Sequence, residues 1–143
     1  MTTENEVREA SKRFYAALNG MVKGETAPMA DIWSHSASAT TMHPNGGREV
    51  GWEQVRASFD GVGKMASGGH IELAEQLIQV AGDMAYELGV ERGQITLAGE
   101  KVALSHRVTN IYRRESGAWR IVHHHADPSP AMLELQGRLS KKA

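Results

Sequence analysis

The N-terminal third of the chain carries apolar residues at helical spacing. They recur every three or four positions, and they are Val7, Ala10, Phe14, Ala17, Leu18 and Met21. This spacing predicts an amphipathic helix, which Thr3 is able to cap and which ends near Gly20 and Gly24. Two further helices are expected, a short one at 28–33 that begins with proline and a longer one at 51–65.

The second half of the chain has the composition of strands separated by tight turns. Apolar and β-branched residues fill segments 70–80, 84–97, 101–114 and 118–126, with glycine-containing turns between them. An earlier strand is expected at 37–43, before the turn-forming sequence PNGG, and the stretch 131–139 is either a short helix or a loose tail. Helices followed by an antiparallel meander predict an α+β fold, with the helices packed on one face of the sheet.

Composition and charge narrow the function classes. A chain of 143 residues is expected to form one domain, covering 1–143. Its 16 basic and 17 acidic residues nearly cancel, so we expect neither a nucleic-acid nor a membrane partner. The absence of cysteine excludes disulfides and thiolate chemistry. There is no signal-peptide pattern and no apolar run long enough to span a membrane, so we expect a cytoplasmic protein. No Walker or Rossmann glycine pattern occurs, and no cofactor is expected.

Three motifs carry a resemblance to a known superfamily. They are RFYAALNG at 13–20, MADIWSHSASATTMHPNGGREVGWEQVRASF at 29–59 and TNIYRRESGAWRIVHHHADPSP at 109–130. Together with the order of the elements, they resemble the nuclear transport factor 2-like superfamily, which includes ketosteroid isomerases, SnoaL-like polyketide cyclases and a kinase association domain. The resemblance implies a cone in which a strongly curved antiparallel sheet wraps around three N-terminal helices. It also implies an apolar pocket inside the cone and a dimer interface on the outer face of the sheet.

The resemblance also implies where an active site would lie. Ketosteroid isomerases have a tyrosine on the first helix where this chain has Phe14, followed by Tyr15. Their general base and second oxyanion donor are aspartates, and the matching positions here are His43 and Asn110. A phenyl ring cannot donate a hydrogen bond, so an authentic ketosteroid isomerase is not expected. His43 would still act as a base near neutral pH and Asn110 as a donor to an oxyanion. The plainer alternatives are that His43 caps the Pro44 turn and that Asn110 ties two strands together.

The sequence WRIVHHHAD places three consecutive histidines on the last predicted strand, and the preceding turn decides which of them face inward. Serine is poorly suited to the first position of a two-residue turn, so a three-residue loop, 115–117, is predicted. This register places His124 on the concave face with Asn110 and Tyr112. A two-residue loop would invert the assignment and make His123 and His125 the chemical pair.

The remaining residues of the last hairpin are assigned to the convex face. In this register that face carries Thr109, Ile111, Trp119, Ile121, His123, His125 and Asp127. So much apolar surface predicts a homodimer through the convex sheet face. His123, His125 and Asp127 also have the alternation of a strand-borne zinc site, but Asp127 precedes a proline beyond the strand, so no metal is expected.

The predicted pocket has apolar walls and few polar groups. Its wall candidates are Phe14, Trp33, Trp52, Phe59, Tyr86 and Tyr112. Glu87 and Glu91 share one strand face and are expected to be solvated or salt-bridged. The alternative is that a glutamate points into the cone, where it would be a second acid–base candidate.

Two functions follow from this picture. The first is a SnoaL-like pocket protein that performs isomerase, cyclase or lyase chemistry on a carbonyl compound, with His43, Asn110 and His124 as its catalytic residues. The second is a non-catalytic ligand-binding or oligomerisation module. A cavity of roughly several hundred Å³ at these side chains favours the first. An interior filled by Phe14 and Trp33 favours the second.

Overall fold

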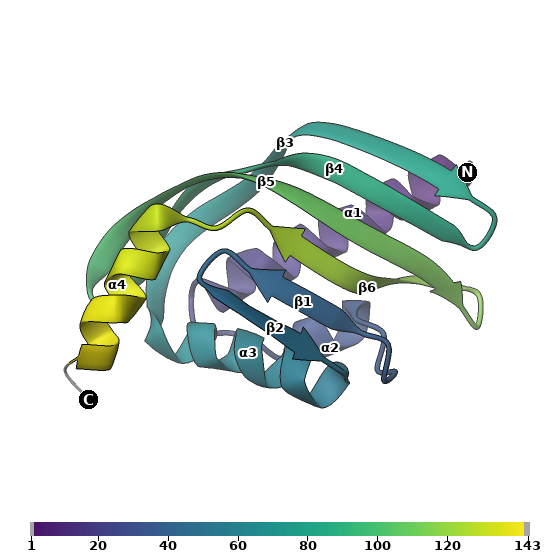
Figure 1. The fold of residues 1–143 in the computed structure, drawn as a ribbon. Helices are drawn as coiled ribbons and strands as arrows, with labels where there is room; N and C mark the ends of the chain where they lie inside the picture. The colour runs from purple at the N-terminus through teal and green to yellow at the C-terminus, as the bar shows by residue number, and fades with distance from the viewer. Residues whose placement is uncertain (1, 142–143) are drawn as a thin grey trace.

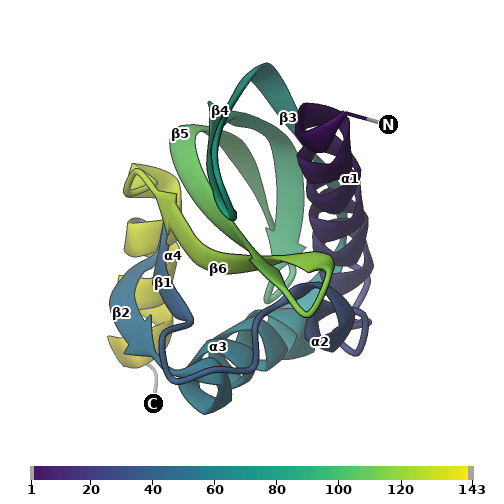
Figure 2. The ribbon, with the colours of Figure 1, turned by 90° about the vertical axis from the view of Figure 1, so that its right-hand side faces the viewer.

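The computed structural model describes residues 2–141 and has an α+β architecture. Its helices are α1 (Thr3–Met21), α2 (Met29–Ile32), α3 (Trp52–Met65) and α4 (Pro130–Lys141). Its strands are β1 (Thr40–His43), β2 (Gly46–Val50), β3 (Ala66–Ala81), β4 (Met84–Leu97), β5 (Glu100–Glu115) and β6 (Ala118–Ala126). The long strands curve around α1, with α2 and α3 on the same side of the sheet (Figures 1 and 2). The predicted cone fold is confirmed.

The six strands form one open sheet in the order β2-β1-β6-β5-β4-β3. Strands β3 to β6 form the predicted antiparallel meander, while β1 pairs with β6 in parallel. The edge strand β2 was not predicted, because its sequence GGREV is polar and largely exposed and has no apolar alternation. Within residues 2–141, no helix is long and apolar enough to cross a membrane.

The helix α1 supplies much of the core. Its N-terminal cap is Thr2, one residue before the predicted Thr3, and Thr2 Oγ1 accepts a hydrogen bond from the amide of Asn5 at 3.1 Å. Its buried stripe is wide enough to include two adjacent aromatic residues, Phe14 and Tyr15. The two rings meet edge to face at 5.1 Å, so both point into the cone.

Two glycines allow β3 and β4 to approach each other closely where the sheet curves. Gly69 and Gly93 have φ values of +129° and +146°, which residues with a side chain rarely adopt. A Cβ on Gly93 would lie 1.9 Å from the backbone oxygen of His70, and one on Gly69 would lie 2.3 Å from that of Gln94. Only glycine fits at either position.

The hairpin between β5 and β6 shows that the predicted three-residue loop is wrong. Glu115 pairs with Ala118, so the loop consists of Ser116 and Gly117 alone. Their φ values of +51° and +82° are those of a type I′ turn, whose twist matches that of the flanking strands. The serine accepts the left-handed conformation because a two-residue turn requires it.

A β-bulge then restores the predicted inward position of His124. Tyr112 pairs with Ile121, but the next inward pair on β5 and β6 is Asn110 with His124, which leaves Val122 as an extra residue. The bulge shifts the register by one residue and offsets the error in the loop. Asn110 and His124 therefore share the concave face.

Before the bulge, the predicted faces of β6 are inverted. Trp119 and Ile121 were assigned to the convex face, yet they are 4% and 0% exposed and belong to the core. The apolar residues that do lie exposed on the convex face come from β3 and β4, and they are Leu77, Met84, Tyr86 and Leu88.

Candidate functional site

Two glutamates from β4 lie inside the cone. Glu87 and Glu91 are 0% and 3% exposed, so the prediction that they are solvated is wrong, and the alternative of a glutamate inside the cone is confirmed. They lie on the same face of β4 because an even number of positions along the strand, four, separates them, and their burial shows that this is the concave face. A buried carboxylate is costly unless hydrogen bonds satisfy it, and both have several donors.

Glu87 is held by three donors. Its Oε1 accepts from the Asn110 amide at 2.9 Å and from the Tyr112 hydroxyl at 2.8 Å, and its Oε2 accepts from Gln76 at 2.6 Å. Burial raises the pKa of Tyr112 well above its ordinary value, and the charge of Glu87 adds to this effect. Tyr112 therefore remains a hydroxyl donor, and this end of the cluster is structural.

Glu91 connects the cluster to two further side chains. Its Oε2 accepts from the Tyr15 hydroxyl at 2.9 Å and its Oε1 from His106 Nε2 at 2.8 Å. Burial by itself would raise the pKa of Glu91, but the hydrogen bonds from His106 and Tyr15 lower it below the ordinary value. Glu91 is thus a carboxylate, and the proton of the shared hydrogen bond resides on His106 Nε2. The other nitrogen, Nδ1, is buried without a hydrogen-bond partner.

Asn110 determines which ring nitrogen of His124 carries the hydrogen. The amide nitrogen of Asn110 donates to Glu87 and to the Tyr15 hydroxyl at 3.1 Å, which fixes the orientation of the amide group. Its oxygen therefore faces His124 Nδ1, at 2.7 Å, and accepts a hydrogen bond from it. Burial lowers the pKa of His124 to about 4, so the ring is neutral and its Nε2 is the basic nitrogen.

His43 lies at the end of β1, next to the other histidines. Ser58 Oγ donates to the carbonyl of Val55 at 2.6 Å, so it accepts a hydrogen bond from His43 Nε2 at 2.8 Å. The ring centroid of His43 is 6.0 Å from that of His124. Burial lowers the pKa of His43 to about 4, against a smaller opposing effect of Glu91. His43 is therefore also neutral near pH 7.

These polar side chains meet at a small, partly open cavity. His43, His106, His124 and Glu91 line it, together with aliphatic side chains from α1, α3, the sheet and α4. Its volume of about 40 Å³ is enough for a few water molecules and too small for an organic substrate. His43 and His124 thus occupy the predicted place, whereas Asn110 lies behind His124.

The predicted aromatic walls do not line this cavity. Phe14, Trp33, Phe59 and Tyr112 are fully or almost fully buried in the core beside it, with Phe14 5.3 Å from the ring of His124. Trp52 stacks on His35 at 4.6 Å, at the beginning of α3. Tyr86 is 45% exposed on the convex face, because its even-numbered position on β4 points away from Glu87.

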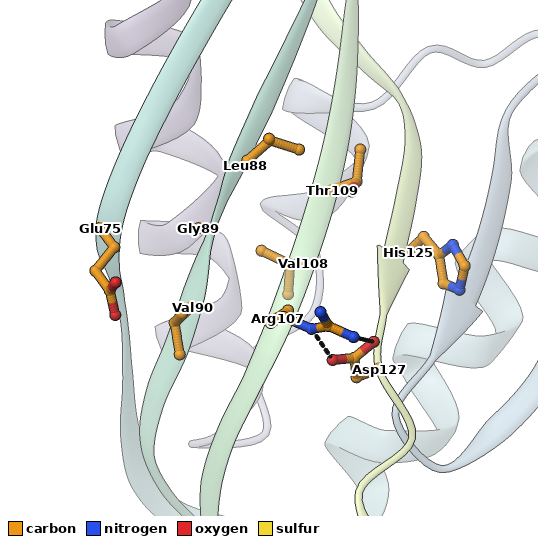
Figure 3. Close-up of a pocket in the computed structure, with 9 residues that line it drawn as sticks. All are labelled: Glu75, Leu88, Gly89, Val90, Arg107, Val108, Thr109, His125 and Asp127. Atoms are coloured by element: carbon orange, nitrogen blue, oxygen red, sulfur yellow. Dashed lines mark hydrogen bonds and ion pairs between the residues drawn. The ribbon is translucent and has the colours of Figure 1, made fainter.

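The other two histidines of β6 lie on the outer side. His123 Nδ1 contacts Thr40 Oγ1 at 2.7 Å, and His125 lines an outer groove of about 470 Å³ with the ion pair of Arg107 and Asp127 (Figure 3). Because Arg107 engages Asp127, that carboxylate is not directed at the two imidazoles. Among residues 2–141, no three histidine, aspartate or glutamate side chains are placed to hold a metal ion.

Two members of the cluster, Tyr15 and His106, were not predicted from the sequence, and Glu91 was expected only as the alternative to a solvated carboxylate. One signal was present, since Glu87 and Glu91 interrupt an otherwise apolar strand face. The partners could not be inferred, because Tyr15 and Glu91 are 76 positions apart and meet only through the packing of α1 on the sheet.

The curved sheet, the enclosed helices and the polar interior define an NTF2-like cone. The sequence profile of the SnoaL-like domain matches residues 7–131, so the chain belongs to the SnoaL-like domain family within this superfamily.

Solved structures agree on the fold. A proposed dehydratase of the NTF2-like family from Streptomyces avermitilis has 23% identity and a TM-score of 0.77, covering 90% of this chain and 96% of that one. An NTF2-like superfamily protein from Salmonella enterica has 24% identity and a TM-score of 0.76, with coverages of 88% and 91%. A proposed kinase association domain from Thiobacillus denitrificans has 25% identity and a TM-score of 0.64, with coverages of 85% and 94%. The comparison with curated proteins gives no match.

Proposed function

We propose that the protein is an acid–base catalyst of isomerase, cyclase or lyase type that acts on a carbonyl-containing organic molecule. The observation that carries this proposal is the convergence of three imidazoles and one carboxylate, His43, His106, His124 and Glu91, on one cavity. Perturbed titratable groups gathered in a cavity are typical of active sites. In this proposal, the sheet and the helices enclose the site, and the histidines and Glu91 transfer the protons.

His124 is the best-placed base. Its Nε2 is unprotonated, its ring lines the cavity, and Asn110 holds its other nitrogen. Nε2 would remove a proton from the carbon next to the carbonyl, and the electron pair of the broken C–H bond would move to the carbonyl oxygen. Burial lowers the pKa of His124, while Glu91 raises it in part and so stabilises the imidazolium that forms. With a β,γ-unsaturated carbonyl compound, the imidazolium would return its proton to the γ-carbon as the double bond moves into conjugation, which is isomerisation. With a β-hydroxy carbonyl compound, it would give its proton to the hydroxyl, which departs as water as the C=C bond forms.

Asn110 has a different role in this proposal from the one its sequence position implies. Both hydrogens of its amide are directed at Glu87 and Tyr15, so it has none left for a substrate oxyanion. We therefore propose that Asn110 positions His124. His43 remains the second candidate base, through Nδ1, since its Nε2 donates to Ser58.

Deuterium exchange tests the proposal without knowledge of the natural substrate. The protein is incubated with 2-acetylnaphthalene in D₂O near neutral pH, and NMR follows deuterium incorporation at the methyl group. We expect faster exchange with the wild type than with buffer, and a loss of at least about tenfold in His124→Gln. His70→Gln is the matched control, because His70 is exposed on β3. Equal rates for the wild type and His124→Gln would exclude His124 as the base.

The small volume of the interior cavity favours a second function, a non-catalytic binding or oligomerisation module. Phe14 and Trp33 fill the core beside the histidines, and the cavity itself holds only about 40 Å³. The solved structure with 25% identity is described as a kinase association domain. Absence of exchange, combined with a stable oligomer in solution, would favour this function.

We also propose that the protein forms a homodimer through the convex face. Leu77, Met84, Tyr86 and Leu88 are each 40–45% exposed there, next to Ile111 on β5. An exposed apolar group of this kind on a sheet face is typical of an interface between subunits. The patch lies on β3 to β5 and reaches the outer groove that Leu88 and His125 both line.

A further inference from the structure

A second, apolar cavity lies beneath the C-terminal helix. It has a volume of about 310 Å³, and its apolar lining consists of Val62, Met65, Leu97, Met132, Leu135 and Leu139. Val62 and Met132 also line the small histidine cavity, so the two spaces adjoin. The larger space lies within the range of small-molecule sites, whereas the histidine cavity is far below it.

Asn45, Val62 and Met132 line both spaces, and Met132 has the most flexible side chain of the three. It lies in the first turn of α4 and is 7% exposed. An unbranched methionine side chain has three rotatable bonds and adapts readily to a new neighbour. A change of its rotamer would join the apolar cavity to the histidines without a change in the fold.

The polar contacts that hold α4 at the mouth of the cone are few and exposed. Asn45 donates to Gln136 at 2.8 Å, and Arg138 pairs with Glu100 at 2.7 Å. Figure 2 shows α4 beside β1 and β2, at one end of the cone. Exposed ion pairs contribute about 0–1 kcal/mol, so α4 is held mainly by its buried side chains, Met132 and Leu135.

The charge of the histidine cavity restricts what can enter it. Glu91 is a carboxylate there, while His43 and His124 are neutral near pH 7 because burial lowers the pKa of each. The remaining titratable group that lines the space, His106, already donates to Glu91. An anionic group that entered this space would lose its hydration and be repelled by the Glu91 carboxylate. No cationic side chain that lines the space is free to pair with it.

We propose that the cavity beneath α4 binds the apolar part of an uncharged carbonyl compound, whose carbonyl end reaches the histidines past Met132. This inference rests on the proposed acid–base function and adds the substrate class to it. It assigns Val62, Leu135 and Leu139 to substrate binding, and it excludes substrates that carry a carboxylate next to the reacting carbon.

Binding measurements separate this inference from the catalytic proposal. The probes are 2-acetylnaphthalene, which is neutral, and 2-naphthoate, which presents a carboxylate on the same ring system. Isothermal titration calorimetry measures the Kd of each for the wild type and two variants. Leu139→Trp fills the apolar cavity, and Glu134→Trp puts the same side chain on an exposed position of α4 that lines neither space.

We expect the ketone to bind at least about tenfold more tightly than the carboxylate. Leu139→Trp should raise the Kd of the ketone by a similar factor, whereas Glu134→Trp should leave it unchanged. Three results would overturn the inference: no binding of the ketone up to its solubility limit, equal or tighter binding of naphthoate, or equal affinities of the two tryptophan variants. Ketone binding that depends on Leu139 but gives no deuterium exchange would instead count against the acid–base function and leave the binding site in place.

Discussion

Asn110 and His124 face each other across β5 and β6, and the amide of Asn110 determines which nitrogen of His124 is basic. The distance from Asn110 Oδ1 to His124 Nδ1 is 2.7 Å. Because Glu87 and Tyr15 occupy the amide hydrogens, the amide cannot turn over without losing both bonds. Because its oxygen and both of its hydrogens are engaged in hydrogen bonds, the buried Asn110 amide holds His124 in one tautomer at the cavity.

The first prediction concerns this pair. In the wild type near pH 7, ¹⁵N NMR of the histidine side chains is expected to show His124 protonated at Nδ1 and unprotonated at Nε2. The variant Asn110→Leu removes the acceptor and leaves the partners unsatisfied, which should lower the free energy of unfolding by about 1–3 kcal/mol. Urea denaturation measures this loss. Asn5→Ala, at an exposed position of α1, should change it by less than about 0.5 kcal/mol. A similar loss in both variants would contradict the assigned network.

The second prediction concerns Glu91. The variant Glu91→Gln replaces a carboxylate that accepts from His106 and Tyr15 by an amide, whose nitrogen would face a donor. We expect a loss of about 2–3 kcal/mol in the free energy of unfolding, since hydrogen bonds to a charged group are the stronger kind. Glu72→Gln, on an exposed strand position, should be neutral. If both variants unfold at the same urea concentration, Glu91 is not held as described.

The third prediction is a loss of stability in mild acid. Burial lowers the pKa of His43 and His124 from 6.5 to about 4, so the unfolded chain binds more protons than the folded chain between these pH values. Stability is therefore full above about pH 6.5 and falls as the pH drops, by on the order of 3 kcal/mol for each histidine. Glu91, whose pKa is lowered, adds a loss below its ordinary 4.5.

Thermal unfolding across this pH range tests the third prediction. The decrease of Tm between about pH 7 and pH 5 should be smaller in His43→Gln than in the wild type, because one titrating group is gone. In His70→Gln the decrease should match that of the wild type, since the His70 side chain is 67% exposed. A pH profile unaffected by His43→Gln would show that this histidine is not buried in the neutral form.

The fourth prediction concerns the turn that the sequence analysis assigned incorrectly. Ser116 has a φ of +51°, a conformation that asparagine tolerates better than serine in a type I′ turn. Ser116→Asn should raise the free energy of unfolding by about 0.5 kcal/mol, whereas Gly117→Ala should lower it by about 1 kcal/mol. Chemical denaturation of the two variants is the measurement. A stabilising alanine at position 117 would be incompatible with the left-handed conformation of Gly117.

The fifth prediction concerns the proposed dimer. Tyr86→Lys places a charge in the exposed apolar group on the convex face and should shift the protein toward monomers. Light scattering coupled to size-exclusion chromatography measures the mass. Glu9→Lys, on the exposed side of α1, serves as the control and should leave the mass unchanged. A monomeric wild type would exclude the dimer at the concentration used.

Local sequence patterns were sufficient to predict most of the helices and strands. The strand limits at 84–97 and 118–126 agree with β4 and β6, because apolar runs bounded by glycine turns are a local signal. The polar strand β2 lacked that signal. The assignment of His124 to the inner face was confirmed for a reason the sequence did not show, since the loop prediction was wrong and the bulge at Val122 offset it.

By itself, the sequence determined the helices, the meander, the family resemblance and His43 and His124 as candidate residues, since each depends on residues close together in the chain. Only the tertiary structure decided that Glu91 and His106 lie beside these histidines and that α4 lines the same cavity. Tyr15 reaches Glu91 from a helix 76 positions away, and His106 meets it across a strand pair. Contacts between residues this far apart in the chain depend on helix packing and on strand register. A two-residue turn or a single β-bulge is enough to change the register.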